Sequence, residues 1–168
     1  MIPQNAEHWI EKLQLAPHPE GGFFRETYRS AEQVSSSHLP GRFSGSRNFS
    51  TSIYFLLRVQ DRSLFHRIKS DELWHYHAGS SLSIYVLQEN DLQIFKLGND
   101  PDKNESLQIT IPANHWFGAM VNPAADFTLA GCTVAPGFDF QDFEMATRGE
   151  LLKTFPMHHD IITKLTKP

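Results

Sequence analysis

The sequence has a single cysteine, no long apolar run and no excess of basic residues. Of its 168 residues, 15 are Lys or Arg and 19 are Asp or Glu, which gives a net charge of −4 at pH 7. One cysteine excludes an intrachain disulfide, so a reducing compartment, the cytoplasm, is the expected location. The acidic balance argues against a partner made of nucleic acid. The apolar stretches are far shorter than the roughly 20 residues of a membrane-spanning helix.

Glycine-rich nucleotide-binding motifs are also missing. The chain has no G-x-G-x-x-G, no G-x-x-x-x-G-K-[ST] and no alternation of strands with helices, which argues against a Rossmann or P-loop role. The amino-terminal stretch MIPQNAEHWIEKLQ has no basic start, so no signal peptide is expected. Cys132 lies in the apolar stretch LAGCTV, and we interpret it as a buried small residue rather than a nucleophile.

Aromatic and β-branched residues are abundant, with 13 Phe and 3 Trp. Nine short stretches are rich in them and are bounded by Gly, Pro, Asn or Asp, which predicts the strands of an antiparallel sandwich or barrel. The stretches are residues 21–30, 50–59, 63–69, 72–79, 82–88, 92–98, 106–112, 115–121 and 127–136. The length suits one domain, residues 1–168, with a core barrel over about 20–140.

Short helices are expected at both ends. Asn5 can cap a first helix, and Thr147 with Glu150 forms a capping box before another. Asp160 can start one more short helix. Between the ends, residues 31–50 are rich in Ser, Gly and Arg and are expected to form a long loop or a mobile flap.

Two stretches, FHRIKSDELWHYHAG (65–79) and IPANHWFGA (111–119), resemble the two sequence motifs of the cupin superfamily. Together with HPEGGFFRETYRS (18–30) and GCTVAPGFDFQDFE (131–144), they are similar to an RmlC-like cupin family (Cupin_5 type) related to the dTDP-sugar epimerases. The resemblance covers nearly the whole chain. It implies an all-β fold, the double-stranded β-helix or jelly-roll barrel with short N-terminal and C-terminal helices, and it implies a homodimer.

The cupin motifs usually supply four metal ligands, and this sequence departs from them. His66 and Glu72 occupy two of the positions, whereas Ile68 and Phe117 stand where histidines are expected. His115 comes two residues before its expected position and shares a strand face with residue 117 if the strand is regular. No cofactor is certain, but His66, Glu72 and His115 could together hold a divalent metal such as Zn, Fe, Mn or Ni.

The same barrel interior also suits a metal-free pocket for a small molecule. By resemblance to the sugar epimerases, His66 is the expected base, and Asp139 or Asp142 is its expected carboxylate partner. Tyr54 or Tyr76 is the expected acid on the other face of the substrate. These assignments predict proton transfer next to a carbonyl group.

Further ligand contacts are predicted along the walls. The resemblance implies that Arg25 and Glu26 reach a nucleotide-linked sugar, since a guanidinium donates two parallel hydrogen bonds to phosphate. The other predicted ligand-binding residues are Glu72, Trp74, His115 and Phe117. By strand alternation, His75 and His77 lie on the face opposite Glu72 and are expected at a sheet or subunit contact. The run His158-His159-Asp160 is expected at the surface.

Three functions remain open at this point. The first is a cupin that binds a carbohydrate or nucleotide-sugar and acts as an epimerase or isomerase through His and Tyr. The second is a metal-dependent oxygenase or isomerase built on the three possible metal ligands. The third is a non-catalytic ligand-binding protein. The fold alone does not choose among them. In each case the partners are a small molecule and a second copy of the chain, with no nucleic-acid polymer and no membrane.

Overall fold

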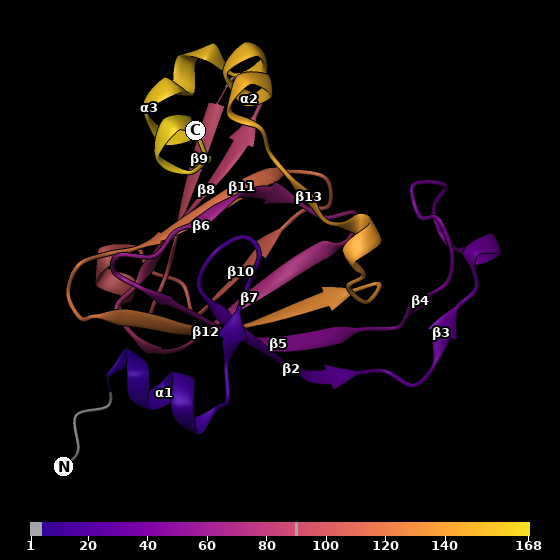
Figure 1. Ribbon diagram of the computed structural model, residues 1–168, viewed down its shortest axis with the longest axis horizontal. Coiled ribbons are helices and arrows are strands. Elements are labelled where there is room, and N and C mark those ends of the chain that lie inside the picture. The colour runs from indigo at the N-terminus through magenta and orange to yellow at the C-terminus, as the bar shows by residue number, and fades with distance from the viewer. Residues whose placement is uncertain (1–4, 90) are drawn as a thin grey trace.

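Two antiparallel sheets face each other in the computed structural model, which describes residues 5–89 and 91–168 (Figure 1). The larger sheet has the strand order β1-β2-β5-β12-β7-β10, and the smaller has the order β13-β6-β11-β8-β9. Strands far apart in sequence are thus neighbours in each sheet, as in a jelly roll. The all-β prediction is confirmed. Positions 1–4 and 90 of the predicted domain lie outside the described residues. The start of the amino-terminal stretch, for which no signal peptide is expected, is among them.

All nine predicted strands are present. They are β2 (Phe23–Arg29), β5 (Thr51–Arg58), β6 (Ser63–Arg67), β7 (Asp71–Gly79), β8 (Leu82–Gln88), β9 (Asp91–Leu97), β10 (Gln108–Ile111), β11 (Trp116–Val121) and β12 (Phe127–Ala135). Four strands of two residues each were not predicted: β1 (Ala16–Pro17), β3 (Gln33–Val34), β4 (Arg47–Asn48) and β13 (Glu144–Met145). Strands this short show no alternation of apolar and polar residues, so sequence periodicity does not reveal them.

The predicted helix caps are also found. The Asn5 side chain accepts a hydrogen bond from the His8 amide at 2.9 Å, and the Thr147 side chain accepts one from the Glu150 amide. The helices are α1 (Ala6–Lys12), α2 (Arg148–Thr154) and α3 (His159–Lys164), with 3-10 turns η1 (Ser36–His38), η2 (Pro101–Lys103), η3 (Phe140–Asp142) and η4 (Pro156–His158). Over residues 5–89 and 91–168, every helix is too short or too polar to cross a membrane.

Three apolar clusters hold these elements together. The central one lies between the sheets and contains Phe55, Trp74, Ile84 and Phe117, with Cys132 buried among them as expected. A second cluster packs α1 on the larger sheet, and a third packs α2 and α3 on the smaller one. The central cluster fills only part of the space between the sheets, and the remainder is the cavity described below.

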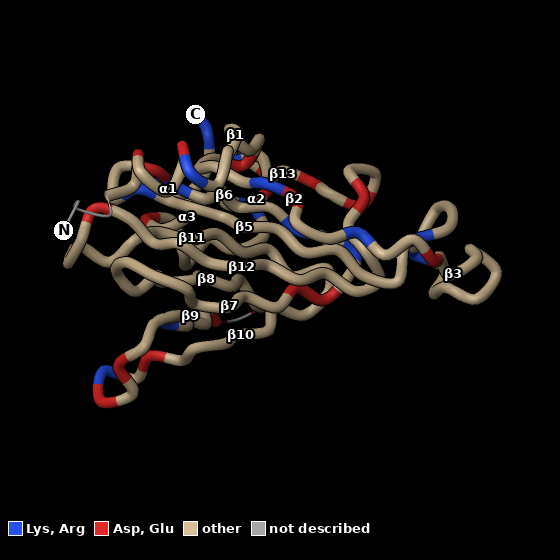
Figure 2. Tube along the Cα trace, turned by 90° about the horizontal axis from the view of Figure 1, so that it is seen from below, with Lys and Arg blue, Asp and Glu red and all other residues tan. Residues whose placement is uncertain are grey.

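Residues 31–50 form an arm rather than a plain loop. Strands β3 and β4 pair in it, and the arm extends away from the barrel (Figure 2). Its base is tied down, since Arg47 donates to both carboxylate oxygens of Asp142 at 2.7 and 2.8 Å in a buried contact. Arg42 donates to the Lys69 carbonyl at 2.7 Å. The arm is therefore anchored to the barrel at its base.

Candidate functional site

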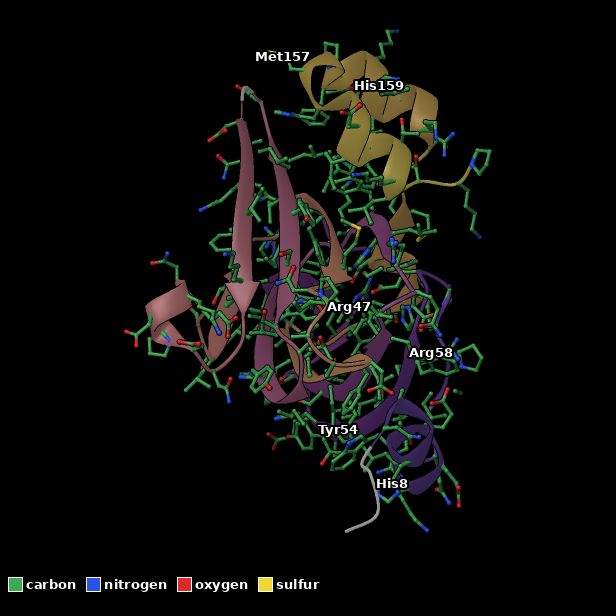
Figure 3. All side chains as sticks on the ribbon, turned by 90° about the vertical axis from the view of Figure 1, so that its left-hand side faces the viewer. His8, Arg47, Tyr54, Arg58, Met157 and His159 are labelled. Carbon is green, nitrogen blue, oxygen red and sulfur yellow. The ribbon has the colours of Figure 1, made fainter. Side chains whose placement is uncertain are left out.

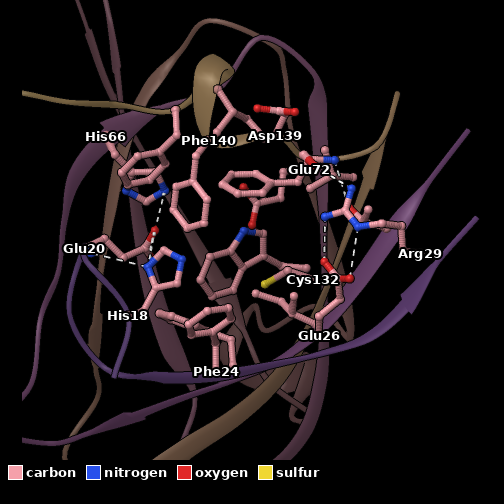
Figure 4. Close-up of a pocket in the computed structure, with 18 residues that line it drawn as sticks. His18, Glu20, Phe24, Glu26, Arg29, His66, Glu72, Cys132, Asp139 and Phe140 are labelled. Carbon is pink, nitrogen blue, oxygen red and sulfur yellow. Dashed lines mark hydrogen bonds and ion pairs between the residues drawn. The ribbon is translucent and has the colours of Figure 1, made fainter. Parts of the chain in front are cut away.

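A cavity of about 290 Å³ opens between the two sheets. Its walls carry aromatic rings and a small set of ionisable groups (Figure 4). The deep ionisable groups are His18, Glu20, His66, Glu72 and Cys132, and those at the mouth are Glu26, Arg29 and Asp139. A concave, mostly apolar cavity with a few convergent polar groups is the usual form of a small-molecule site.

The Glu20 carboxyl group lies between His66 and His18 (Figure 4). His66 Nδ1 donates to the Leu64 carbonyl oxygen at 2.7 Å, so its Nε2 carries no proton in the neutral ring. The 3.1 Å contact between Nε2 and Glu20 Oε2 therefore needs one proton between the two atoms. Burial raises the pKa of Glu20 and lowers that of His66. Both shifts favour a neutral Glu20 acid that donates to the neutral His66 ring.

Other groups fix this pair in place. Ser63 Oγ donates to Glu20 Oε1 at 2.7 Å, and the Leu64 amide donates to the Glu20 carbonyl oxygen at 2.9 Å. The Glu20 amide donates to His18 Nδ1 at 3.3 Å, which leaves the proton of a neutral His18 on Nε2. Gly21 follows with φ of +113°, and a β-carbon there would collide with the Arg62 carbonyl oxygen. Glycine is thus required for the chain to turn directly after Glu20.

Glu72 comes from β7 in the larger sheet, whereas His66 comes from β6 in the smaller one. Only 8% of Glu72 is exposed, and it makes no ion pair with the described residues. Burial raises its pKa to about 7, against the opposing effect of His66, and the Cys132 thiol donates a hydrogen bond to it. Burial also raises the pKa of Cys132, so the thiol is protonated at neutral pH and is no nucleophile. Glu72 can therefore gain or lose a proton near pH 7.

Arg29 and Glu26 form an ion pair at the mouth. Arg29 donates to the two carboxylate oxygens of Glu26 at 3.0 and 2.7 Å (Figure 4). Regular alternation after Phe24 and Glu26 would place Tyr28 on the cavity wall instead. A bulge between Glu26 and Tyr28 shifts the register, so Arg29 lines the cavity and Tyr28 is exposed. The family resemblance predicted Glu26 as a ligand contact, whereas regular strand alternation does not place Arg29 on this wall.

Both tyrosines predicted as acids lie outside the cavity. Ile53 and Phe55 line it, so Tyr54 between them faces outward, with its ring 5.9 Å from that of His77. Figure 3 shows Tyr54 at the end of the molecule where His8 and α1 lie. Tyr76 is also absent from the lining, and its hydroxyl donates to the Gly79 carbonyl at 2.6 Å. The acid role predicted for these tyrosines is wrong because neither hydroxyl reaches the cavity.

The predicted metal ligands do not come together. His66 and Glu72 line the cavity, but His115 lies in a separate groove beside Arg67 and Trp116. The expectation that residue 115 shares a strand face with residue 117 fails because β11 begins at Trp116. His115 instead belongs to a turn after Asn114, which has φ of +63°.

The metal that the cupin motifs imply does not fit the described residues. Across residues 5–89 and 91–168, no group of three or more His, Cys, Asp or Glu side chains is arranged to hold a metal ion. His66 Nε2 faces Glu20, and Ile68 lines the cavity where a further ligand is expected. Glu20 Oε2 contacts both His66 Nε2 at 3.1 Å and His18 Nδ1 at 3.4 Å, so a carboxyl oxygen occupies the position between the two rings (Figure 4).

The remaining predicted residues have other places. Trp74 lines the cavity as predicted, and Phe117 packs behind it, with its ring centroid 4.2 Å from that of His66. Arg25 is not on the lining, and its guanidinium lies 6.0 Å from the centre of the Tyr54 ring. His75 is on the outer face, 3.2 Å from the Thr133 hydroxyl.

The carboxylate partner of His66 is Glu20, not Asp139 or Asp142. Asp139 lies at the mouth, and Asp142 pairs with Arg47. Sequence reasoning missed His18 and Glu20, although both stand in the stretch HPEGG. The available signal was two ionisable residues in this short stretch, the second of them directly before a double glycine.

Comparisons with known proteins agree with this architecture. The family model described as "Cupin superfamily (DUF985)" matches residues 7–146. The "Uncharacterized protein YML079W" of Saccharomyces cerevisiae is 30% identical over 149 residues, which is 83% of this chain and 74% of the yeast protein.

Two solved structures are similar over almost the whole chain. Protein SO0799 from Shewanella oneidensis is 41% identical with a TM-score of 0.89, covering 98% of this chain and 99% of that one. A hypothetical protein from Leishmania major is 35% identical with a TM-score of 0.89, covering 98% of this chain and 100% of that one. None of the three names states an activity.

Proposed function

This chain belongs to the DUF985 family of the cupin superfamily, and from that premise we propose that its barrel binds one small polar molecule and moves a proton on it, as epimerases and isomerases do. The fold hosts many activities, so the proposal rests on the cavity itself. The observation that carries it is the placement of two proton-holding groups on facing sheets. Glu72 is on the larger sheet, and His66, paired with Glu20 from the turn between β1 and β2, is on the smaller sheet.

The chemistry of these groups suits acid–base catalysis. A general acid or base works best when its pKa lies near the working pH, and that of Glu72 is about 7. The Glu20–His66 pair holds one proton and can give it up or take it back with small movements. A ligand between the sheets has one such group on each side. Glu72 thus takes the role that the sequence suggested for a tyrosine.

The size of the cavity limits the ligand. About 290 Å³ corresponds to roughly ten water molecules at the volume of liquid water. That space suits a molecule of the size of one sugar ring and not a ring with its nucleotide. We therefore propose a carbohydrate-sized substrate held inside the barrel. The nucleotide of a nucleotide-linked sugar would have to lie outside the mouth.

The test is uptake of deuterium from D2O into candidate substrates, followed by mass spectrometry. The panel covers aldoses, ketoses, amino sugars and nucleotide-linked sugars. The protein is expected to label at least one of them, and Glu72→Gln and His66→Gln to slow labelling by about 100-fold or more. His75→Gln is the matched control, since His75 is a histidine on the outer face. No labelling of any compound, or labelling unaffected by Glu72→Gln, would contradict the proposal.

A second candidate function is ligand binding without catalysis. Both ring nitrogens of His66 contact protein atoms, and both carboxyl oxygens of Glu20 do so too. A base engaged in this way must break one of these contacts before it can accept a proton from a ligand. Thermal stabilisation by a compound that takes up no deuterium would favour this alternative.

A further inference from the structure

The cations on and beside the cavity wall are already paired. Arg29 is the one guanidinium on the lining, and it donates two hydrogen bonds to Glu26, one to Asn48 Oδ1 at 2.9 Å and one to the Phe138 carbonyl at 3.1 Å. Four of its five N–H groups are thus in use. Arg47, behind the mouth, is paired with Asp142. A phosphate or carboxylate on a ligand would therefore have to compete with Glu26 for its cation.

One carboxylate at the mouth is not matched in this way. Asp139 lines the cavity and makes no ion pair within the described residues, and its side chain accepts a hydrogen bond from the Gln141 amide at 2.8 Å. That hydrogen bond caps the short turn η3. Arg29 and Arg47 attract the Asp139 carboxylate at longer range, but neither forms a direct ion pair with it. The nearest cations, Arg29 and Arg47, have carboxylate partners of their own.

Three aromatic rings line the cavity together with Asp139. Phe138 and Phe140 flank Asp139 in sequence, and their ring centroids are 5.0 Å apart at an angle of 82°. The Phe143 ring is 6.0 Å from that of Phe140, and all three rings line the cavity. Phe140 is also 56% exposed, so its ring can be reached from solvent as well as from the cavity. Ring faces beside a carboxylate attract an ammonium group by cation–π and ionic contact.

A second unsatisfied group lies deeper. Trp74 lines the cavity, and its Nε1–H is buried with no hydrogen-bond partner among the described residues. An indole nitrogen only donates, so the missing partner is an acceptor such as a hydroxyl or carbonyl oxygen. A buried donor without a partner is costly, which favours a ligand that supplies that oxygen.

We propose that the ligand is a hydroxylated amine of sugar-ring size, of the amino-sugar class, whose ammonium group lies at Asp139 among Phe138, Phe140 and Phe143 and whose oxygen accepts from Trp74. This inference takes the position of the ligand from the proposed function and adds that the ligand carries a positive charge. A phosphorylated or nucleotide-linked sugar is the disfavoured ligand, because each cation near the mouth already has a carboxylate partner.

A charge series on one ring tests it. Glucosamine, glucose and glucose 6-phosphate share the ring and differ in charge, and their affinities are measured by calorimetry at pH 6.5, low salt and in an amine-free buffer. Glucosamine is expected to bind about tenfold more tightly than glucose and glucose 6-phosphate more weakly than both. Equal or tighter binding of the phosphate, or failure of all three to bind, overturns the proposal.

Variants separate charge from fold. Asp139→Asn keeps a side chain that can cap η3 and removes only the charge, so it is expected to lower glucosamine affinity to the level of glucose. Glu144→Gln, a nearby carboxylate outside the cavity, is expected to keep the tenfold preference. Trp74→Phe keeps a ring and removes the N–H, and it is expected to weaken glucosamine and glucose alike. Persistence of the amine preference in Asp139→Asn overturns the assignment.

The outcomes also distinguish this inference from the proposed function. An amine preference without any deuterium uptake leaves the ligand class standing and removes the catalysis. Suppose instead that a phosphorylated sugar binds more tightly than the amine and takes up deuterium. That result leaves the catalysis standing and removes the ligand class.

Discussion

Glu72 and Asp142 are both buried carboxylates near the cavity, and their surroundings differ completely. Asp142 accepts two hydrogen bonds from Arg47, and Lys69 lies 3.6 Å away. Glu72 has no cationic partner in the described chain, only the Cys132 thiol. A carboxylate buried with a matched cation holds the arm to the barrel. One buried without a partner costs stability, so Glu72 is a better candidate for a functional group than Asp142 is.

The largest expected effect comes from breaking the matched pair. Arg47→Met leaves the Asp142 carboxylate buried beside Lys69 alone, and we expect a loss of about 3–4 kcal/mol in the free energy of unfolding. Urea denaturation measures it. The double variant Arg47→Met with Asp142→Leu should recover much of the loss, since no charge is then left unpaired. A single variant as stable as the parent would refute this view of the pair.

The next largest effect is the dependence of stability on pH that Glu72, the carboxylate without a cationic partner, is expected to cause. The pKa of Glu72 is about 7 in the folded protein against an ordinary value of 4.5, so the folded state holds a proton that the unfolded chain loses between these pH values. The free energy of unfolding therefore falls by about 3 kcal/mol as the pH rises from about 4.5 to 7, and the loss is complete above pH 7.

Glu72→Gln should remove that part of the pH dependence. The variant is expected to match the parent near pH 5 and to exceed its stability near pH 8, as measured by urea denaturation at the two pH values. Glu20 and its raised pKa contribute in the same direction and are unchanged in the variant. A parent and variant that lose stability equally between pH 5 and pH 8 would show that Glu72 is not the group responsible.

A smaller effect is expected at the Glu20–His66 pair. Ser63→Ala removes the hydroxyl that donates to Glu20 Oε1 at 2.7 Å, and we expect a loss of about 1 kcal/mol. The hydrogen bond from Ser63 lowers the pKa of Glu20, so its loss should raise that pKa further. Urea denaturation and NMR titration of a protein labelled at Glu side chains measure the two changes. If neither the free energy of unfolding nor the pKa of Glu20 changes, Ser63 does not stabilise the Glu20–His66 pair.

The smallest effect is expected from an exposed pair. Glu144 accepts from Arg67 at 2.7 Å, but their side chains are 53% and 38% exposed. Glu144→Gln should change the free energy of unfolding by less than about 0.5 kcal/mol. A loss comparable to that of Arg47→Met would mean that burial does not explain the difference in strength between the Arg47–Asp142 pair and the exposed Arg67–Glu144 pair.

Much of the fold and part of the site could be predicted from local patterns. Short stretches rich in aromatic and β-branched residues and bounded by turn residues located the nine longer strands. Alternation along one of them placed Glu72 and Trp74 on the same face, and both line the cavity. It was unreliable where regularity ends: the bulge before Arg29, and the turn that holds His115. The cupin resemblance is confirmed at the level of the family, whereas the relation to dTDP-sugar epimerases, the homodimer and the cytoplasmic location stay predictions.

The sequence by itself determined the strands, the helix caps and the inward face of most strands, because these depend on residues a few positions apart. Only the tertiary structure decided which ionisable groups meet. Glu20 reaches His66 across 46 positions because the loop after β1 is hydrogen-bonded to β6 through Ser63 and Leu64. Glu72 has no ion pair within the described residues, whereas Arg29 and Arg47 are bound to Glu26 and Asp142. Such encounters depend on the packing of two sheets, which no local pattern records.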